Sequence, residues 1–357
     1  MANPLLVNLS FLIAKPTGLA TYGLNLVPHL DDLKPLLLSP LDHPGYRVAS
    51  VAGNMSAEQG SAGHARRLTW TQLTLPHIYR TENAGLLFSP IPEAPLGLGV
   101  RFAVTVHDFI ARRFSKPTSP LALYTRYYVP QVLRRAQHII TNSEATARDA
   151  VDFCGVSAHK ITSIPLAYDG NHFKDLELPV KPYFLHVGRH DPHKNVARVL
   201  AAFARLSSTI DGELWLAGTP DSRYTPQLRD QATEYGLSDR VRFLDYVPYA
   251  QLPVLINQAI AVVFPSLWEG FGLPVLEAMA CGTPVITSNL SSLPEVAGDA
   301  GLLVDPYSVA AISGAMKAIA TDDVTRRHLK QAGLKRATQF SWEWTGEETR
   351  RILGTLL

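Results

Sequence analysis

The chain is poor in cysteine and has no long apolar run. Its 357 residues include two cysteines, Cys154 and Cys281, far apart and without metal-ligand spacing to histidine. Neither a disulfide framework nor structural zinc is therefore expected. No uncharged apolar run reaches the roughly 18 residues of a membrane span, and no basic residue precedes the first apolar stretch as it would in a signal peptide. These absences predict a cytoplasmic protein, peripheral at the inner face of the membrane if it meets one.

An excess of either charge is also missing. The 33 Lys and Arg residues nearly balance the 31 Asp and Glu residues, and the net charge of +2 is too small to suggest nucleic-acid binding. Hydrophobic residues make up 46% of the chain, which is ordinary for a globular protein. At roughly 100 to 200 residues per domain, the length predicts two domains.

Short apolar runs alternate with segments long enough for a helix, as is typical of a parallel sheet wrapped by helices. The sequence therefore predicts an α/β protein with two doubly wound, Rossmann-like domains. The boundary is expected in the polar stretch 170–182, which gives domains 1–175 and 176–338. Ligands bind beyond the carboxyl ends of parallel strands, so the active site is expected in a cleft between the domains. The predicted strands lie in 5–12, 46–53, 85–90, 101–109, 138–143, 161–167, 183–189, 213–218, 241–247, 259–265, 284–289 and 301–306.

The segment 265–286, PSLWEGFGLPVLEAMACGTPVI, has the pattern of a strand, a glycine turn and a helix. Pro274 suits the first helical turn, and Gly282 is placed to end the helix after about two turns. Before the helix, Gly270 and Gly272 let backbone N–H groups approach a ligand, toward which the positive end of the helix dipole also points. The segment therefore predicts a cradle for phosphate.

Two carboxylates flank this turn. Glu269 precedes it and Glu277 lies a turn into the helix, so both are expected to face one ligand. The glycines alone would equally suit an ordinary loop between two surface carboxylates, and it is the complete string that favours a binding site.

A second group of candidates lies in FLHVGRHDPHKN, where a strand ends at Gly188 and the cations Arg189 and Lys194 flank the following turn. A leaving nucleoside diphosphate gains negative charge, and cations and N–H donors can stabilise it without a metal ion. No paired carboxylate motif for Mg²⁺ accompanies them, so no metal is expected. Two solvated surface cations are the alternative.

Three stretches stand together in one order: HVGR followed by Lys194, PSxxEGFGLPxLEAMAxGxPVI, and LPEVAGDAGLLVDP. They resemble retaining glycosyltransferases of the GT-B fold, family 4, which includes bacterial sugar transferases for polysaccharide and glycolipid assembly. The resemblance covers nearly the whole chain. It implies an acceptor-binding N-terminal domain, a nucleotide-sugar-binding C-terminal domain, and a terminal helix in 339–357 that packs back on the first domain.

The same resemblance implies roles for the candidate residues. Arg189 and Lys194 would hold the diphosphate of the sugar donor, Glu269 would contact the transferred sugar, and Glu277 would bind the ribose hydroxyls. The nucleobase would lie near 245–249. The further donor-binding positions are Gly188, Asp245, Tyr246, Val247, Gly270, Phe271, Gly272 and Leu273.

In the first half, His107 and Asp108 follow the apolar run RFAVTV. Similar family members carry His-Asp near the transferred sugar. His107 therefore joins Arg189, Lys194 and Glu269 as a predicted catalytic residue, first of all a positioning one, with a core histidine as the alternative. The loop AKPTGLATYG lacks the close glycine pair of many relatives. Together with Asp108, it supplies candidate loop contacts only, namely Lys15, Thr17 and Gly18.

The resulting hypothesis is a retaining, metal-independent hexosyltransferase without a cofactor. The expected donor is a UDP-sugar, or GDP-mannose as second choice, and the expected acceptor is a glycan or lipid-linked glycan in polysaccharide biosynthesis. Two other classes stay open. A nucleotide-sugar epimerase of similar fold would need acid and base residues that are not apparent, and a non-catalytic nucleotide-binding subunit would be expected to lack one of Arg189, Lys194, Glu269 or Glu277.

The segment 109–143 suggests a contact with an anionic membrane surface. It carries cations and no acid, interleaved with aromatic and aliphatic residues, a composition that suits such an interface. An ordinary helix with a solvated basic face is the alternative. The residues concerned are Arg112, Arg113, Lys116, Arg126, Arg134 and Arg135, with Phe114, Leu121, Leu123, Tyr124, Tyr127 and Tyr128.

Overall fold

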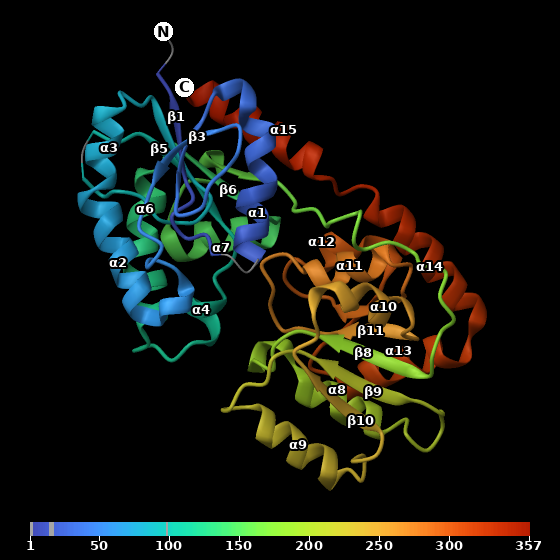
Figure 1. The fold of residues 1–357 in the computed structure, drawn as a ribbon. Helices are drawn as coiled ribbons and strands as arrows, with labels where there is room; N and C mark the ends of the chain where they lie inside the picture. The colour runs from blue at the N-terminus through green and yellow to red at the C-terminus, as the bar shows by residue number, and fades with distance from the viewer. Residues whose placement is uncertain (1–2, 14–17, 98) are drawn as a thin grey trace. The chain divides into compact units, whose positions relative to one another are not determined.

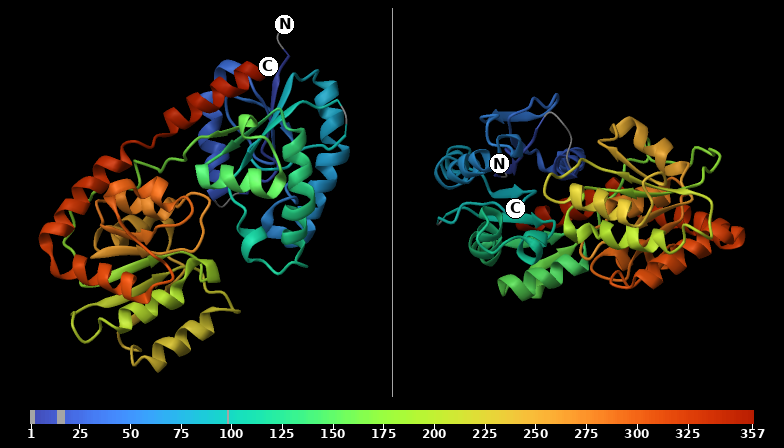
Figure 2. Two further views of the ribbon diagram at one scale, coloured as in Figure 1. Left: turned by 180° about the vertical axis from the view of Figure 1, so that it is seen from behind. Right: turned by 90° about the horizontal axis from the view of Figure 1, so that it is seen from below.

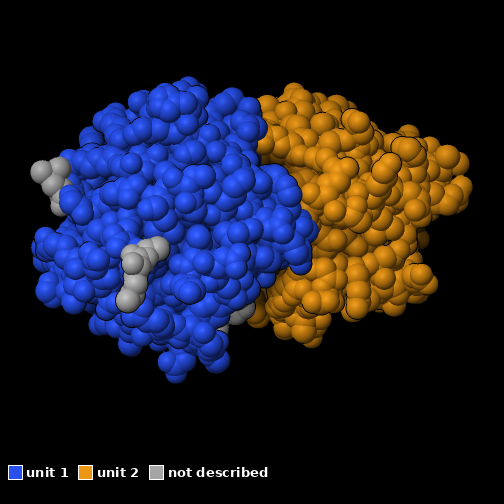
Figure 3. Space-filling model, turned by 90° about the horizontal axis from the view of Figure 1, so that it is seen from above, with its two compact units in different colours: residues 1–166, 341–357 blue, residues 167–340 orange. Residues whose placement is uncertain are grey.

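A computed structural model of the chain describes residues 3–13, 18–97 and 99–357 (Figure 1). The chain divides into two compact units: residues 1–166 with 341–357 form unit 1, and residues 167–340 form unit 2 (Figure 3). The domain boundaries drawn from the sequence, after residues 175 and 338, stay a prediction, because compactness does not establish which segments fold independently. Within the described residues, no helix is long and apolar enough to cross a membrane.

Unit 1 is built on a parallel sheet whose described strands run in the order β3-β2-β1-β4-β5-β6-β7. Strands β1, β2, β4 and β5 are buried along their whole length, as expected where helices cover both faces of a sheet. The strands are β1 Leu5–Asn8, β2 Leu36–Ser39, β3 Arg47–Ser50, β4 Leu86–Ser89, β5 Phe102–Val106, β6 His138–Thr141 and β7 Ile161–Ser163.

Strand β2 is the one described strand that the sequence did not predict. Its apolar run is only three leucines long and lies between Pro35 and Pro40, which indicate a turn or loop by local rules. The strand forms because it fits between two neighbours: Leu36 pairs with Leu6 of β1 on one side and with Arg47 of β3 on the other. Tertiary pairing therefore overrides the local signal.

The helices of unit 1 flank this sheet, and α15 closes it from the far end of the chain (Figures 1 and 2). The hydroxyl of Thr345 in α15 donates to the Pro165 carbonyl at 2.8 Å, and Arg101 donates to the Leu356 carbonyl at 2.7 Å. The helices are α1 Gly18–Leu26, α2 Gly60–Leu73, α3 Leu75–Thr81, α4 Ile110–Phe114, α5 Pro120–Leu123, α6 Val129–Arg135, α7 Glu144–Cys154 and α15 Trp342–Leu356, with a π-helical turn at Tyr124–Tyr128. The terminal segment thus packs on unit 1, as the family resemblance implied.

Unit 2 contains a second parallel sheet with strand order β10-β9-β8-β11-β12-β13, and every strand predicted for this half is present. Helix α8 shows why: Val196, Val199, Leu200 and Phe203 recur at helical spacing and are buried against the sheet. The predicted doubly wound α/β architecture is confirmed. The strands are β8 Tyr183–Val187, β9 Glu213–Ala217, β10 Val241–Asp245, β11 Ala261–Phe264, β12 Val285–Ser288 and β13 Leu302–Val304. The helices are α8 Val196–Ala204, α9 Thr225–Glu234, α10 Leu252–Asn257, α11 Leu273–Ala280, α12 Leu293–Ala297, α13 Val309–Thr321 and α14 Asp323–Ala337.

Candidate active site

The carboxyl ends of β8, β9 and β10 are held together by close backbone contacts. Gly188, with φ of 144°, donates its N–H to the Ala217 carbonyl at 2.9 Å. A Cβ atom on Gly218 would lie 1.9 Å from the Gly188 carbonyl oxygen, so only glycine fits at 218. The Gly218 N–H in turn donates to the Asp245 carbonyl at 2.9 Å. Gly188 and Asp245, both predicted as donor-binding positions, therefore belong to one continuous edge of the sheet.

Lys194 and Glu269 form the central ion pair of this edge. The Lys194 Nζ lies 2.7 Å from Glu269 Oε1, and the two side chains are only 17% and 9% exposed. The Lys194 ammonium also lies 5.1 Å from the centre of the Phe264 ring. Two predicted catalytic residues from separate loops thus meet in a largely buried site, where charge interactions are stronger than in water.

The turn that carries Lys194 is fixed by its neighbour Asn195. This residue has a left-handed backbone, with φ of 64°, at the start of α8. Its side-chain amide donates to the carbonyls of Pro265 and Pro306 at 3.0 and 2.7 Å. Because Pro265 opens the glycine-rich segment, Asn195 joins the two predicted motifs directly.

The glycine loop is held by two serines that the sequence reasoning missed. The Glu269 N–H donates to the Ser291 hydroxyl at 3.1 Å. The Ser292 hydroxyl lies 3.1 and 2.7 Å from the carbonyls of Glu269 and Phe271. A signal was available, because serines directly before Leu-Pro are typical of a helix start, here that of α12.

Helix α11 begins at Leu273, directly after this loop, with Pro274 in its first turn as predicted. Gly272 has φ of 112°, and a Cβ there would lie 2.7 Å from the Leu293 side chain. Gly282 follows the helix with φ of 69°. The predicted sequence of strand, glycine turn and two-turn helix is therefore present, with its N-terminal end adjoining Glu269 and Gly270.

Arg189 takes no part in the Lys194–Glu269 ion pair. It belongs to a network of two carboxylates and two guanidinium groups. Its own guanidinium is 64% exposed and lies 3.3 Å from Asp191 and 3.4 Å from Asp221. Arg223 binds Asp221 with two side-chain hydrogen bonds, at 2.6 and 2.9 Å. These bonds from Arg223 are the main reason that the pKa of Asp221 lies well below its ordinary value. Asp221 and Arg223 were not predicted, and their only sequence signal is the D-x-R spacing after β9.

Glu277 and the segment 245–249 form the next part of the same edge. Burial raises the pKa of Glu277 to about 7, and its charge contributes to raising the pKa of Tyr249 to about 12, where burial is the main cause. The Tyr249 ring stacks on His172 with centroids 3.9 Å apart. The predicted positions for ribose and nucleobase thus lie close together.

Strand β10 ends in a tight turn at this place. Asp245 has a left-handed backbone, with φ of 53°, and its carboxylate lies 3.4 Å from Arg229. Tyr246, the next residue, is 69% exposed, whereas Val247 is half-buried. The turn therefore presents an aromatic side chain at the surface beside the Gly188–Gly218 contact.

In unit 1, His107 follows the carboxyl end of β5 and is a neutral, oriented side chain. Its Nε2 lies 2.9 Å from the Pro90 carbonyl, and its ring packs edge-to-face on Tyr22 at 4.7 Å. Burial lowers the pKa of His107 to about 4. At neutral pH, Nε2 therefore carries the proton and donates a hydrogen bond to the Pro90 carbonyl. Nδ1 is then left as a hydrogen-bond acceptor.

The remaining predicted loop contacts are less informative. The Asp108 carboxylate accepts the Ile110 N–H at 2.9 Å, which supports the start of α4. Gly18 is the first residue of α1. Lys15 and Thr17 lie outside the described residues.

The chain has two doubly wound units. In unit 2, a glycine loop, the buried Lys194–Glu269 ion pair and the N-terminus of α11 follow the strands. This fold and this site define a glycosyltransferase of the GT-B fold. Known families agree: "Glycosyltransferase Family 4" matches residues 18–171 and "Glycosyl transferases group 1" matches residues 169–336. The chain belongs to the family-4 glycosyltransferases.

Similar proteins include two bacterial mannosyltransferases. The chain is 35% identical over 235 residues to the O-antigen chain mannosyltransferase B of Escherichia coli, an alignment that covers 62% of this chain and 61% of that protein, less than two thirds of its length. It is 28% identical over 328 residues to the O-antigen chain mannosyltransferase RfbU of Salmonella typhimurium, with 88% and 90% covered. The sucrose-phosphate synthase of Thermosynechococcus elongatus shares the fold, with a TM-score of 0.80 at 22% identity over 99% of each chain.

Proposed function

We propose that the protein transfers a hexose from a nucleoside diphosphate sugar to a glycan or lipid-linked glycan in polysaccharide assembly, with retention of configuration and without a metal ion. The observation that carries this proposal is the buried Lys194–Glu269 pair beside the glycine loop and the N-terminus of α11. Preorganised charge of this kind stabilises a leaving group most where water is excluded.

In the proposed reaction, the bond between the anomeric carbon and the phosphate oxygen breaks and a bond to the acceptor oxygen forms on the same face. The acceptor proton passes to the departing phosphate. Lys194 and Arg189 stabilise the charge that collects on the diphosphate, together with N–H groups of the glycine loop. Glu269 stabilises the cationic sugar.

GDP-mannose is the first donor to test. Sequence alone ranked a UDP-sugar first, but both relatives described above are named mannosyltransferases, and they share 35% and 28% identity with this chain. Base contacts through backbone at 245–249 would leave little trace in side-chain identity, so the relatives are the better guide. A UDP-hexose is the second donor to test.

Thermal-shift measurements with GDP, UDP and ADP test the donor site. A nucleotide at 100 times its dissociation constant adds about 2.7 kcal/mol to the free energy of unfolding. We expect GDP to give the largest shift, and mannose to be transferred only when an acceptor is present. Donor consumption without an acceptor-dependent product would indicate an epimerase, and nucleotide binding without turnover of any donor would indicate a non-catalytic subunit.

We also propose that the segment 109–143 contacts an anionic membrane. Two of its cations bind other groups of the protein: Arg113 pairs with Asp149, and Arg134 donates to the Cys154 carbonyl at 2.9 Å. Lys116 and Arg126 are exposed. Four apolar side chains of the segment are exposed beside them, namely Phe114, Leu121, Leu123 and Tyr127. This combination of exposed cations and apolar groups supports the contact.

A further inference from the structure

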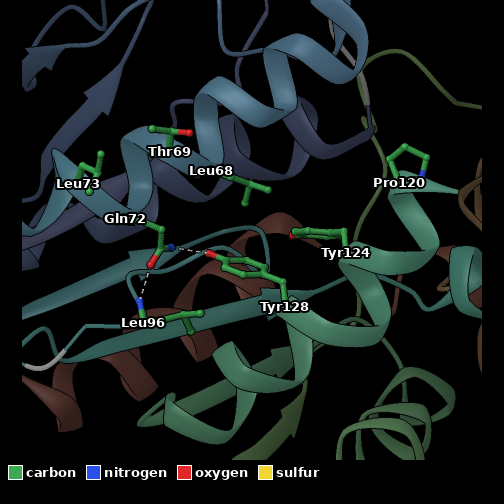
Figure 4. Close-up of a pocket in the computed structure, with 8 residues that line it drawn as sticks. All are labelled: Leu68, Thr69, Gln72, Leu73, Leu96, Pro120, Tyr124 and Tyr128. Carbon is green, nitrogen blue, oxygen red and sulfur yellow. Dashed lines mark hydrogen bonds between the residues drawn. The ribbon is translucent and has the colours of Figure 1, made fainter. Parts of the chain in front are cut away.

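Unit 1 contains an apolar pocket of about 550 Å³ between α2 and the turn 120–128 (Figure 4). It has no part in the donor-binding edge described above. Leu68, Thr69, Gln72 and Leu73 of α2 form one wall, and Leu96 forms the floor. Pro120, Tyr124 and Tyr128 form the opposite wall.

Hydrogen bonds fix the walls and occupy the polar atoms of Gln72 and Tyr128. The Gln72 side chain donates to the Tyr128 hydroxyl at 3.0 Å and accepts the Leu96 N–H at 2.9 Å (Figure 4). The Tyr128 hydroxyl donates to the Ala94 carbonyl at 2.8 Å. The rings of Tyr124 and Tyr128 stack with centroids 5.3 Å apart in the π-helical turn, a feature often found at functional sites. The pocket is therefore preformed, and its inner surface is largely carbon.

Charge and exposure around the pocket favour an anionic amphiphile. Neither α2 (60–73) nor the segment 110–142 contains an Asp or Glu residue. Between them lie Glu82, Glu93 and Asp108. Glu93, on the loop that also carries Leu96, is buried and bound at both oxygens by Arg67, at 2.8 Å each. The segments that form the two walls carry exposed cations close in sequence to the lining residues: Arg66 on α2, and Lys116 and Arg126 on the segment 110–142. The apolar side chains of Leu73, Leu121 and Tyr127 are exposed as well.

We infer that this pocket binds an acyl chain of an anionic phospholipid, whose phosphate lies among the exposed cations. The inference rests on the membrane contact proposed above and gives that contact a specific site. The volume lies within the roughly 300 to 1,000 Å³ usual for small-molecule sites. Binding of such a chain to an apolar pocket that opens to solvent is favourable, because the apolar walls are then removed from water.

The test uses dihexanoylphosphatidylglycerol below its micelle concentration, with glycerol 1-phosphate as the head group without chains. We expect the short-chain lipid, and not glycerol 1-phosphate, to raise Tm of the full chain. Leu68→Trp should fill the pocket and weaken lipid binding at least tenfold. Leu303→Trp, at an exposed leucine of unit 2, is the matched control and should bind like the wild type. Leu73→Ser, at a side chain that is 72% exposed, should weaken binding without affecting the core.

Equal shifts with lipid and glycerol 1-phosphate would overturn the inference, as would wild-type lipid binding by both Leu68→Trp and Leu73→Ser. A concentration-dependent dimer that masks these residues and excludes the lipid would also overturn it, because a second copy would then occupy the pocket. The same samples are titrated with GDP, UDP and ADP. If lipid binding depends on the pocket but no nucleotide binds, the pocket assignment stands and the proposed transferase function fails.

Discussion

At the scale of single residues, the two cations of the candidate site differ in burial and in their partners. Lys194 is buried against Glu269, whereas Arg189 is largely exposed and shares its carboxylate Asp221 with Arg223. The lysine is thus fixed before a ligand arrives. In the proposed mechanism the arginine moves toward the diphosphate, while Arg223 continues to compensate Asp221.

Replacing either cation tests its role in the proposed transfer. We expect Lys194→Ala and Arg189→Ala to lower kcat by about 10² to 10³ with a smaller change in the KM for the donor, because their charge is needed most as the diphosphate leaves. Steady-state kinetics with saturating acceptor measure both constants. Lys317→Ala, at an exposed position on α13, is the control. Wild-type turnover in both site variants would remove these residues from the mechanism.

Glu277 should make stability depend on pH. Burial raises its pKa from 4.5 to about 7, so between these values the folded protein holds a proton that the unfolded chain releases. Its contribution to the free energy of unfolding is therefore greatest below about pH 4.5 and is lost as pH rises through about 7. Glu277→Gln should be more stable than the wild type at pH 8 and similar to it at pH 5.

Urea unfolding at the two pH values measures this difference. Glu347→Gln, at an exposed position on α15, is the control and should follow the wild type at both. A Glu277→Gln variant that is less stable than the wild type at pH 8 would show that the ionised carboxylate is stabilised in the folded protein.

At the scale of elements, two glycines of α15 have opposite roles. A Cβ on Gly346 would lie 2.3 Å from Cγ of His29, near the backbone of the facing helical turn, whereas one on Gly354 would lie 3.8 Å from the Leu33 side chain. We expect Gly346→Ala to lower the free energy of unfolding by about 1 to 3 kcal/mol through overpacking. Gly354→Ala should raise it by up to about 1 kcal/mol through helix propensity.

Chemical denaturation of the two variants beside the wild type gives both values. Equal stabilisation by both substitutions would mean that α15 does not pack closely at Gly346.

The elements that the sequence predicted have local signals. Pro274 and Gly282 mark the two ends of α11. The strands of unit 2 are apolar runs bounded by turn residues. The features that it missed depend on contacts between distant residues. Ser292 holds carbonyls 21 and 23 residues away, and Asp221 meets Arg189 across 32 residues. In the same way, the neutral state of His107 depends on burial and on the Pro90 carbonyl, neither of which a strand-end histidine reveals in sequence.

At the scale of the whole molecule, the proposed chemistry relies on protein cations and N–H groups. We therefore expect transfer to continue after EDTA treatment and the product to keep the anomeric configuration of the donor. Proton NMR of the product gives the configuration, and activity before and after chelation gives the metal dependence. Loss of activity on chelation with recovery on adding Mg²⁺, or an inverted linkage, would contradict the proposal.

The discontinuity of unit 1 has a consequence for biosynthesis. The chain leaves unit 1 after residue 166 and returns to it only at 341, so a ribosome completes all of unit 2 before it makes α15. Until then, surfaces of α1 and of the turn at His29 that α15 covers are open to solvent. All segments of unit 2 are thus made before α15, whereas unit 1 lacks one of its helices until 341–357 is made. We expect a released chain truncated after residue 340 to keep a protease-resistant unit 2 beside a unit 1 that chaperones bind.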